Sequence, residues 1–139
     1  MDRLSYERLE VWQKALAFAN RIYEVTAEFP KSEVFGLVSQ MRRAGVSVAA
    51  NIAEGTSRSS LTEQARFAEI AYGSLCEVTT MLHLARSQNL LPADVFEQMY
   101  ENAMEICRLL SGYRRSAEAR ARAAKKGQKP STINHQPST

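Results

Sequence analysis

Helix-breaking residues are scarce in this sequence. Its 139 residues include only six glycines and four prolines, and each proline lies where a helix could begin, end or be absent. Long stretches without glycine or proline favour helices over a sheet, which needs frequent turns. We therefore expect an all-helical chain, and its length suits one domain.

Long apolar runs are also lacking. No segment approaches the roughly 20 consecutive apolar residues that span a bilayer, and the charged start MDRLSYERLE has no apolar signal core. We expect a cytoplasmic protein with no membrane contact. Cys76 and Cys107 form no CxxC pair, and we predict that both are reduced, buried thiols in helix interiors.

Residue patterns typical of catalysis or metal binding are missing too. His83 and His135 are the only histidines, and no group of His, Cys and carboxylate residues has metal-ligand spacing. The glycines form no phosphate-binding loop. We predict no catalytic site, no metal and no cofactor, and a half-buried structural role for His83. An enzyme would need a site assembled between subunits.

Charge is distributed unevenly along the chain. Residues 1–113 contain 11 Lys and Arg against 14 Asp and Glu, a net charge of −3. Residues 114–139 contain seven Lys and Arg against the single acidic residue Glu118, a net charge of +6. Such asymmetry suggests contact with nucleic acid or another anionic surface.

Apolar spacing predicts four helices, at about residues 7–28, 32–54, 60–88 and 92–113. Steps of three and four place side chains on one helix face. In the first helix we expect a buried stripe of Leu9, Trp12, Leu16, Ala19, Tyr23 and Thr26, widened by Ala15, Ile22 and Phe29. In the fourth, heptad spacing predicts a seam of Val95, Met99, Ala103, Ile106, Leu110 and Tyr113.

The connections between these helices are short. Phe29-Pro30 interrupts the chain after the first helix, Gly55 is a suitable C′ residue for the second, and Ser60 and Glu63 have capping-box spacing before the third. Short loops favour antiparallel neighbours. We therefore predict an all-α, up-down-up-down four-helix bundle over residues 1–113.

Residues 114–139 form a basic tail. The alanine- and arginine-rich part to residue 126 favours a continued helix with nothing to bury, and the polar end from Gly127 predicts disorder. We identify these candidate nucleic-acid contacts in the tail and near the second helix: Arg42, Arg58, Arg114, Arg115, Arg120, Arg122, Lys125, Lys126 and Lys129.

The second helix has apolar residues on several faces, which a surface helix of a monomer does not need. Val34, Val38, Met41, Val48 and Ile52 share one side, and Phe35, Leu37, Ala44 and Val46 lie elsewhere. Gly45 in mid-helix costs about 1 kcal/mol relative to alanine, which suggests a packing role. We predict that this helix also contacts another subunit. The alternative is the most buried helix of a monomer.

Polar residues run along the same helix. Buried polar groups need partners, and a pairing of Arg43 with Glu77 or Glu54 would supply one. Either these residues form a network that fixes helix register, or Arg42, Arg43 and Arg58 form a surface that contacts phosphate. We favour the network for Arg43 and the surface for Arg58. The predicted network consists of Gln40, Arg43, Ser47, Asn51, Glu54, Ser74 and Glu77.

Several segments in residues 6–112 resemble one known family. They are Leu9–Ala15, Phe29-Pro30, Phe35–Leu37, Gln40–Ala44, Ser47-Val48, Asn51–Gly55, Arg58, Gly73–Leu75 and Glu77. With these segments the sequence resembles the four-helix-bundle proteins encoded in intervening sequences of bacterial 23S rRNA genes. Those proteins are often grouped with the accessory variability determinant proteins of diversity-generating retroelements.

The resemblance implies a homopentamer with a suspected nucleic-acid-binding role. For the retroelement relatives it implies association with a reverse transcriptase. Gly45 stands where the family leads us to expect alanine or a similar residue, and the tail from Arg114 lies outside the pattern. Our leading hypothesis is an oligomeric bundle that presents basic tails to RNA or DNA. The alternatives are a protein-adaptor scaffold, for example for a reverse transcriptase, and an inert structural oligomer.

Overall fold

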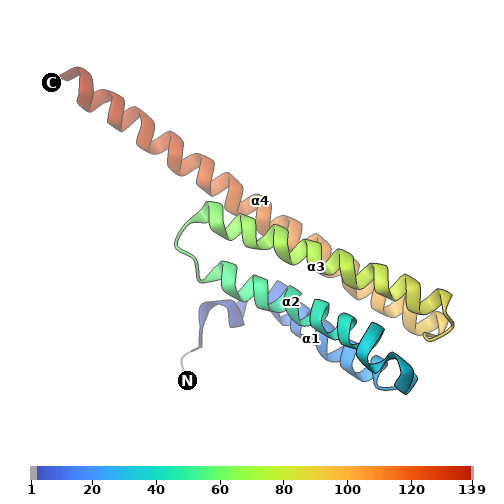
Figure 1. Cartoon of the computed structure of the whole chain (residues 1–139). Helices are drawn as coiled ribbons and strands as arrows, with labels where there is room; N and C mark the ends of the chain where they lie inside the picture. Colours follow the sequence, from blue (N-terminus) through green and yellow to red (C-terminus); the bar gives the residue numbers. More distant parts are fainter. Residues whose placement is uncertain (1–2, 139) are drawn as a thin grey trace.

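The computed structural model is a bundle of four antiparallel helices (Figure 1). They are α1 (Glu10–Thr26), α2 (Ser39–Thr56), α3 (Leu61–Ser87) and α4 (Ala93–Ser138). The structure describes the backbone of residues 3–138 and the side chains of residues 3–127. Helices α1 and α3 each pack against α2 and α4. The predicted all-α, up-down-up-down topology is therefore confirmed.

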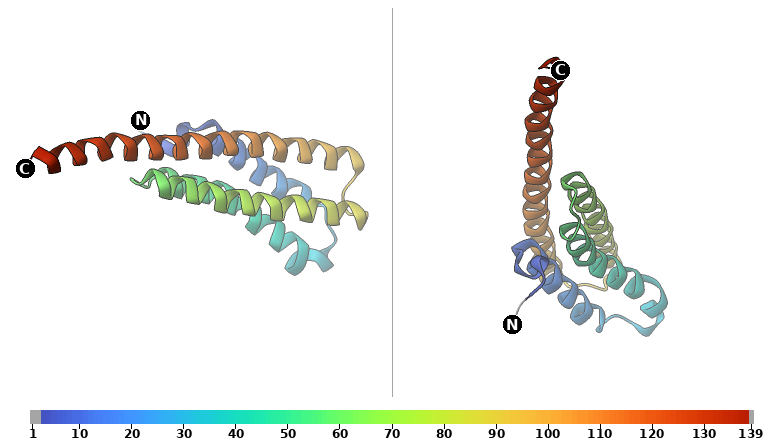
Figure 2. Two further views of the ribbon diagram at one scale, coloured as in Figure 1. Left: turned by 90° about the horizontal axis from the view of Figure 1, so that it is seen from above. Right: turned by 90° about the vertical axis from the view of Figure 1, so that its left-hand side faces the viewer.

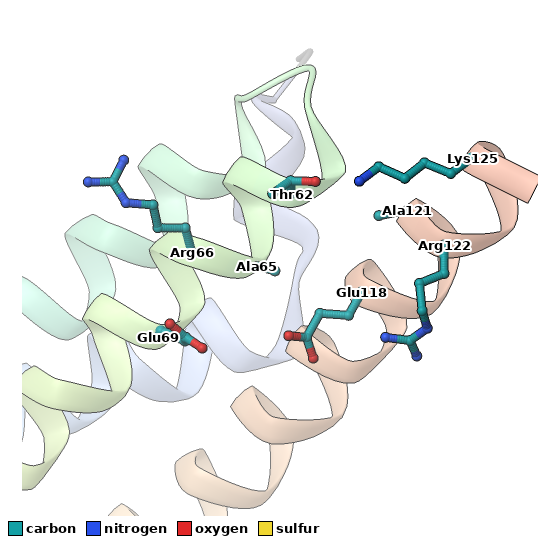
Figure 3. Close-up of a pocket in the computed structure, with 8 residues that line it drawn as sticks. All are labelled: Thr62, Ala65, Arg66, Glu69, Glu118, Ala121, Arg122 and Lys125. Carbon is teal, nitrogen blue, oxygen red and sulfur yellow. The ribbon is translucent and has the colours of Figure 1, made fainter.

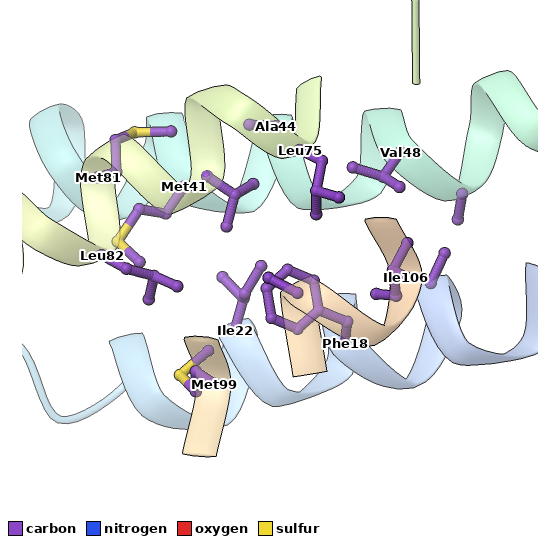
Figure 4. Close-up of a cluster of buried hydrophobic side chains, with 14 of the residues drawn as sticks. Phe18, Ile22, Met41, Ala44, Val48, Leu75, Met81, Leu82, Met99 and Ile106 are labelled. Carbon is purple, nitrogen blue, oxygen red and sulfur yellow. The ribbon is translucent and has the colours of Figure 1, made fainter. Parts of the chain in front are cut away.

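The core lies between the four helices (Figure 4). Phe18 and Ile22 of α1, Met41 of α2 and Leu82 of α3 are fully buried there. Burying each such side chain contributes about 1.5–3 kcal/mol. The heptad seam of α4 is confirmed, since Met99, Ala103, Ile106 and Leu110 are buried. Within residues 3–138, no helix is both long and apolar enough to cross a bilayer.

The buried face of α1 differs from the predicted stripe. Leu16 and Tyr23 are 42% and 46% exposed, so their predicted burial is wrong. The inward face is displaced around the helix, and it consists of Val11, Ala15, Phe18, Ala19, Ile22, Val25 and Thr26. The sequence offers two adjacent apolar lines on this helix. Contact with α2 and α4 selects the line that contains Phe18.

The segment before α2 is less regular than predicted. A short 3-10 turn (Lys31–Glu33) and a π-helical turn (Val34–Val38) replace the first turns of the expected helix. Gly36 has non-helical dihedral angles within the π turn, φ −108° and ψ −106°. This geometry leaves the neighbouring Phe35 side chain 96% exposed.

Two glycines allow α2 to approach its neighbours closely. The prediction of Gly55 as a C′ residue is wrong: α2 continues through it to Thr56, and Gly55 is buried. A Cβ atom on Gly55 would lie 2.6 Å from Cβ of Phe67 on α3. A Cβ atom on Gly45 would lie 2.6 Å from Cδ1 of Ile22 on α1. Both glycines therefore serve helix packing.

The ends of α3 follow its capping residues. The Ser60 hydroxyl accepts a hydrogen bond from the Glu63 amide at 3.3 Å, as the capping-box spacing predicts. At the other end, Asn89 adopts φ 59°, and the Leu90 amide donates to the Ala85 carbonyl at 2.9 Å. This is the six-to-one bond of a Schellman motif, in which asparagine tolerates the left-handed conformation.

Helix α4 extends past the rest of the bundle (Figure 2). The sequence suggested that α4 has nothing to bury after Tyr113. This expectation is wrong, because Ala117 is 0% exposed. The predicted basic helical extension is thus present, and its first turns belong to the bundle. The helical backbone continues to Ser138, and the side chains from residue 128 onward lie outside the described residues. Disorder from Gly127 stays a prediction.

Alanine substitutions at two glycines should change stability in opposite directions. Gly73→Ala in α3 gains helix propensity and meets no atom within 4 Å, so we expect stabilisation by about 0.5–1 kcal/mol. In Gly55→Ala the clash with the Phe67 Cβ atom outweighs the same gain, and we expect destabilisation by about 1–2 kcal/mol. Urea unfolding of both variants measures this difference. Equal stabilisation of the two variants would show that α2 and α3 can move apart at position 55 with no loss of folding free energy.

Candidate nucleic-acid interface

The first residue of the basic extension is tied to the bundle. The Arg114 guanidinium lies 3.7 Å from the Glu69 carboxylate of α3 and 4.0 Å from that of Glu118. The Arg114 Nε atom is buried and has no hydrogen-bond partner among the described residues. Arg114 therefore anchors α4 to α3, and two carboxylates offset its charge.

The next cations of the extension are differently placed. Arg115, Arg122 and Lys126 are exposed, and their steps of seven and four residues place them on one face of α4. Among the side chains of residues 3–127, no carboxylate forms an ion pair with any of the three. Their charges are therefore available to an external anion.

Arg120 and Lys125 lie beside this face. Arg120 is exposed, and its Nε donates to the Ser116 carbonyl at 3.4 Å. Lys125 extends from α4 toward Thr62, in the first turn of α3 (Figure 3). Lys129, the last predicted contact, has a side chain outside the described residues. We use the name basic face for all five exposed cations, both those on the face and those beside it, namely Arg115, Arg120, Arg122, Lys125 and Lys126.

A shallow groove separates the basic face from α3. Arg66, Arg122 and Lys125 line it, but Glu69 and Glu118 line it as well. The two carboxylates offset most of the positive charge within the groove (Figure 3). Arg115, Arg120 and Lys126 do not line the groove, so its carboxylates do not offset their charges.

Arg42 has a structural position. Its Nε donates to the Thr26 hydroxyl at 3.0 Å, and a terminal nitrogen donates to the Tyr23 carbonyl at 3.3 Å. The guanidinium also lies 4.5 Å from the centroid of the Tyr23 ring. These contacts fasten α2 to the end of α1. Arg42 therefore holds two helices together, a role that sequence analysis missed.

Arg43 is exposed, and the predicted pairing with Glu77 or Glu54 is absent from the described side chains. Glu54 instead pairs with Arg58 at 2.9 Å. The Arg58 guanidinium also lies 4.9 Å from the centroid of the Phe67 ring. Arg58 is thus on the surface, as predicted, but its charge has a partner. Arg43 is the cation of α2 that remains available.

The predicted polar network is smaller than expected. The Ser47 and Ser74 hydroxyls share a hydrogen bond of 2.9 Å between α2 and α3. The Asn51 amide donates to the Ser47 carbonyl at 2.8 Å and to its hydroxyl at 3.0 Å. Gln40, Glu54 and Glu77 are exposed instead. Ser47, Asn51 and Ser74 therefore form the part of the network that joins the two helices.

The remaining candidate chemical residues lie on the surface of α3 and α4. His83 is exposed, not half-buried, and its ring centroid lies 5.1 Å from that of Phe96 and 5.7 Å from that of Tyr100. Cys76 is exposed and Cys107 is half-buried, so the prediction of two buried thiols is wrong. Among the described residues, no group of three or more His, Cys, Asp and Glu could hold a metal ion.

Substitutions at Arg42 and Arg43 should separate a structural arginine from an exposed one. Each removes the same charge from adjacent positions. Arg42→Ala loses two hydrogen bonds and the contact with the Tyr23 ring, so we expect destabilisation by about 1–2 kcal/mol. Arg43→Ala should change stability by less than about 0.5 kcal/mol. Equal losses in thermal and urea unfolding would contradict the assigned role of Arg42.

Comparison with known proteins connects this fold to a family. A family model described as 23S rRNA-intervening sequence protein matches residues 7–112. No protein with a curated description matches the chain. The predicted relation to accessory variability determinant proteins stays a prediction.

A solved structure has the same fold. It is a crystal structure of a protein of unknown function from the S23 ribosomal protein family of Bacteroides thetaiotaomicron. It superposes with a TM-score of 0.68 at 26% sequence identity, over 75% of this chain and 97% of that chain. The family match covers well over half of the sequence and leaves out the basic face. The chain belongs to the family of 23S rRNA-intervening sequence proteins.

Proposed function

We propose that this protein is a non-catalytic, cytoplasmic nucleic-acid-binding protein that acts as a homo-oligomer. The basic face of α4 contacts the phosphate backbone of RNA or DNA. One observation carries this proposal: the exposed cations Arg115, Arg122 and Lys126 share one face and have no carboxylate partner among the described side chains.

The spacing of these cations suits a phosphate backbone. Arg115 and Arg122 are about 10.5 Å apart along the helix axis, and Arg122 and Lys126 about 6 Å apart. A helix that projects from the bundle can lie along such a charged chain. Phosphate contacts carry no base information, so we expect weak sequence specificity and strong salt dependence.

Ion pairs and net charge on the bundle support the same assignment by contrast. Lys14 pairs with Glu105 at 3.4 Å, and Arg66 pairs with Glu63 at 3.5 Å. Residues 1–113 also have a net charge of −3, which repels phosphate. Contact with nucleic acid is therefore favoured at α4 and disfavoured over most of the bundle.

An exposed apolar patch supports self-association. Phe35, Val34 and Val46 belong to α2 or the turn before it, and Tyr23 of α1 adjoins them. Phe35 is 96% exposed and the others are 43% to 46% exposed. A cluster of this kind, with an aromatic residue at its centre, is typical of interaction sites. We therefore assign the patch to a subunit contact in the homopentamer that the family resemblance implies.

Ring assembly would increase the effect of the basic face. Five subunits would present five copies of the same cationic helix, and a nucleic acid bound to one would meet the next at high effective concentration. Affinity then depends on both features, namely the free charges of α4 and the contact between subunits.

Removal of the free charges should weaken binding and flatten its salt dependence. In the full chain, a triple change of Arg115, Arg122 and Lys126 to Gln removes three exposed cations without touching the buried Ala117. We expect at least about tenfold weaker binding of a fluorescent 20-nucleotide RNA or a DNA duplex near 100 mM salt. The slope of log K against log[salt] should fall by about 2–3 for each subunit engaged.

A matched variant controls for net charge. Changing Arg8, Arg86 and Arg108 to Gln removes the same number of exposed cations from the bundle, and these three form no ion pair within residues 3–127. We expect this variant to bind nearly as the wild type does. If both triple variants lose the same affinity, binding follows total charge, and the basic face has no particular role.

Substitution of Phe35 should disrupt the oligomer and leave the bundle folded. Phe35 makes almost no contact within its own chain, so Phe35→Ser should keep the wild-type helix content while light scattering shows a smaller particle. Leu4→Ser is the control, because Leu4 is also exposed, at 63%, and lies far from the patch in sequence. A monomeric wild type, or an unchanged Phe35→Ser particle, would disprove the assigned contact.

A further inference from the structure

Cys76 of α3 and Cys107 of α4 occupy facing positions along the seam between these helices. Two contacts establish this register. Glu69 and Arg114 form an ion pair at 3.7 Å, and the rings of His83 and Tyr100 lie 5.7 Å apart. Along α3, Cys76 lies seven residues after Glu69 and seven before His83. Along α4, Cys107 lies seven residues before Arg114 and seven after Tyr100.

A step of seven residues is nearly two helical turns and returns a side chain to the same face. Because α3 and α4 are antiparallel, moving seven residues along both helices leads from one facing pair to the next. The seam therefore carries three pairs at intervals of about 10.5 Å. The cysteines form the middle pair, and the pairs on both sides are in contact.

Tyr72 supplies an independent observation that the thiols are close. The pKa of Tyr72 is raised above its ordinary value of 10.0, first by the charge of Cys76 and then by that of Cys107. Both thiols therefore lie near enough to the Tyr72 phenol for their charges to act on it, which agrees with the register of the seam.

The two cysteines are also accessible. Cys76 is exposed and Cys107 is half-buried, and neither forms a disulfide in this structure. An accessible thiol beside a second thiol is the arrangement that permits oxidation at one sulfur and resolution by the other. Structural thiols of the core, by contrast, are inert because reagents do not reach them.

We propose that Cys76 and Cys107 are a redox-modifiable dithiol that closes to an intrachain disulfide between α3 and α4. The oxidant is a hydroperoxide such as hydrogen peroxide. The exposed Cys76 thiolate attacks one peroxide oxygen; an S–O bond forms, the O–O bond breaks, and the departing hydroxide becomes water with a proton from solvent. Cys76 is then a sulfenic acid.

The second step closes the bond. The Cys107 thiolate attacks the Cys76 sulfur; the S–S bond forms, the S–O bond breaks, and hydroxide leaves and becomes water with the proton lost by Cys107. Two electrons pass from the two sulfurs to the peroxide. A low-molecular-weight thiol reverses the reaction by thiol–disulfide exchange. The product would fix α3 to α4 at the middle of their seam.

Mass spectrometry of the full-length protein tests the proposal. Dilute protein is treated with a small excess of hydrogen peroxide, and intact mass, free thiols and non-reducing peptide maps are measured. We expect loss of two hydrogens, loss of both thiols, and one peptide cross-link between Cys76 and Cys107 within a single chain. Dithiothreitol should restore the starting mass, and the oxidised form should unfold at a higher temperature than the reduced form.

Single substitutions test the assigned roles of the two sulfurs. Cys107→Ser should accumulate a Cys76 sulfenic acid that dimedone traps. Cys76→Ser should consume peroxide at least about tenfold more slowly, because the remaining thiol is less accessible. Both variants replace residues outside the buried core, so circular dichroism should match the wild type. Oxygen addition without a cross-link, cross-links only between chains, or two persistent thiols in the wild type would overturn the proposal.

Discussion

The antiparallel register of α3 and α4 determines where most features of this protein lie. Glu69 with Arg114 and His83 with Tyr100 are contacts of one seam, separated by two heptads. The same register places Ala117 against the beginning of α3, where it is fully buried. Because α3 begins at Leu61 and α4 continues to Ser138, the remaining length of α4 has to leave the bundle. The projecting basic helix is a consequence of this difference in length.

Positive and negative charges are separated for a related reason. Several cations on the bundle lie near glutamates of neighbouring helices or of the next turn, as Lys14 and Arg66 do. Beyond Ala117, Glu69 of α3 is the carboxylate of a neighbouring helix that lines the groove beside α4, and α4 itself has only Glu118 there. Exposed charges interact weakly beyond about 8–10 Å at physiological salt. The acidic bundle therefore weakens the potential of the basic face little, once the helix has moved away from it.

Helix α2 shows how one residue pattern can serve several contacts. Gly45 and Gly55 admit Ile22 and Phe67 at distances that a Cβ atom would prevent. Ser47 and Ser74 add a directional hydrogen bond to this close packing, which favours one register over others that bury similar apolar area. Other apolar residues of α2 and of the π-helical turn before it, with Phe35 the most exposed, face outward. The excess of apolar residues on this helix thus includes both core and surface.

The sequence alone determined the number of helices, their order, the capping of α3 and the heptad seam of α4. These features depend on spacing and on local hydrogen bonds, which the chain carries wherever it folds. Family membership followed from the same segments. The exposed Phe35 was named from the sequence as one of several apolar residues, but its exposure depends on the π-helical turn that carries it.

Only the tertiary structure decided which of two adjacent residues faces a neighbour. Neighbours on a helix differ by about 100° in direction, so a rotation of α2 by one residue exchanges the roles of Arg42 and Arg43, and the same rotation of α1 exchanges Leu16 for Ala15. Periodicity leaves such rotations open when two adjacent lines are apolar or basic. The sequence did not predict the facing positions of Cys76 and Cys107, because these positions depend on the register between two helices. Packing fixed the rotations and the register, because contact between helices decides which side chains fill the core.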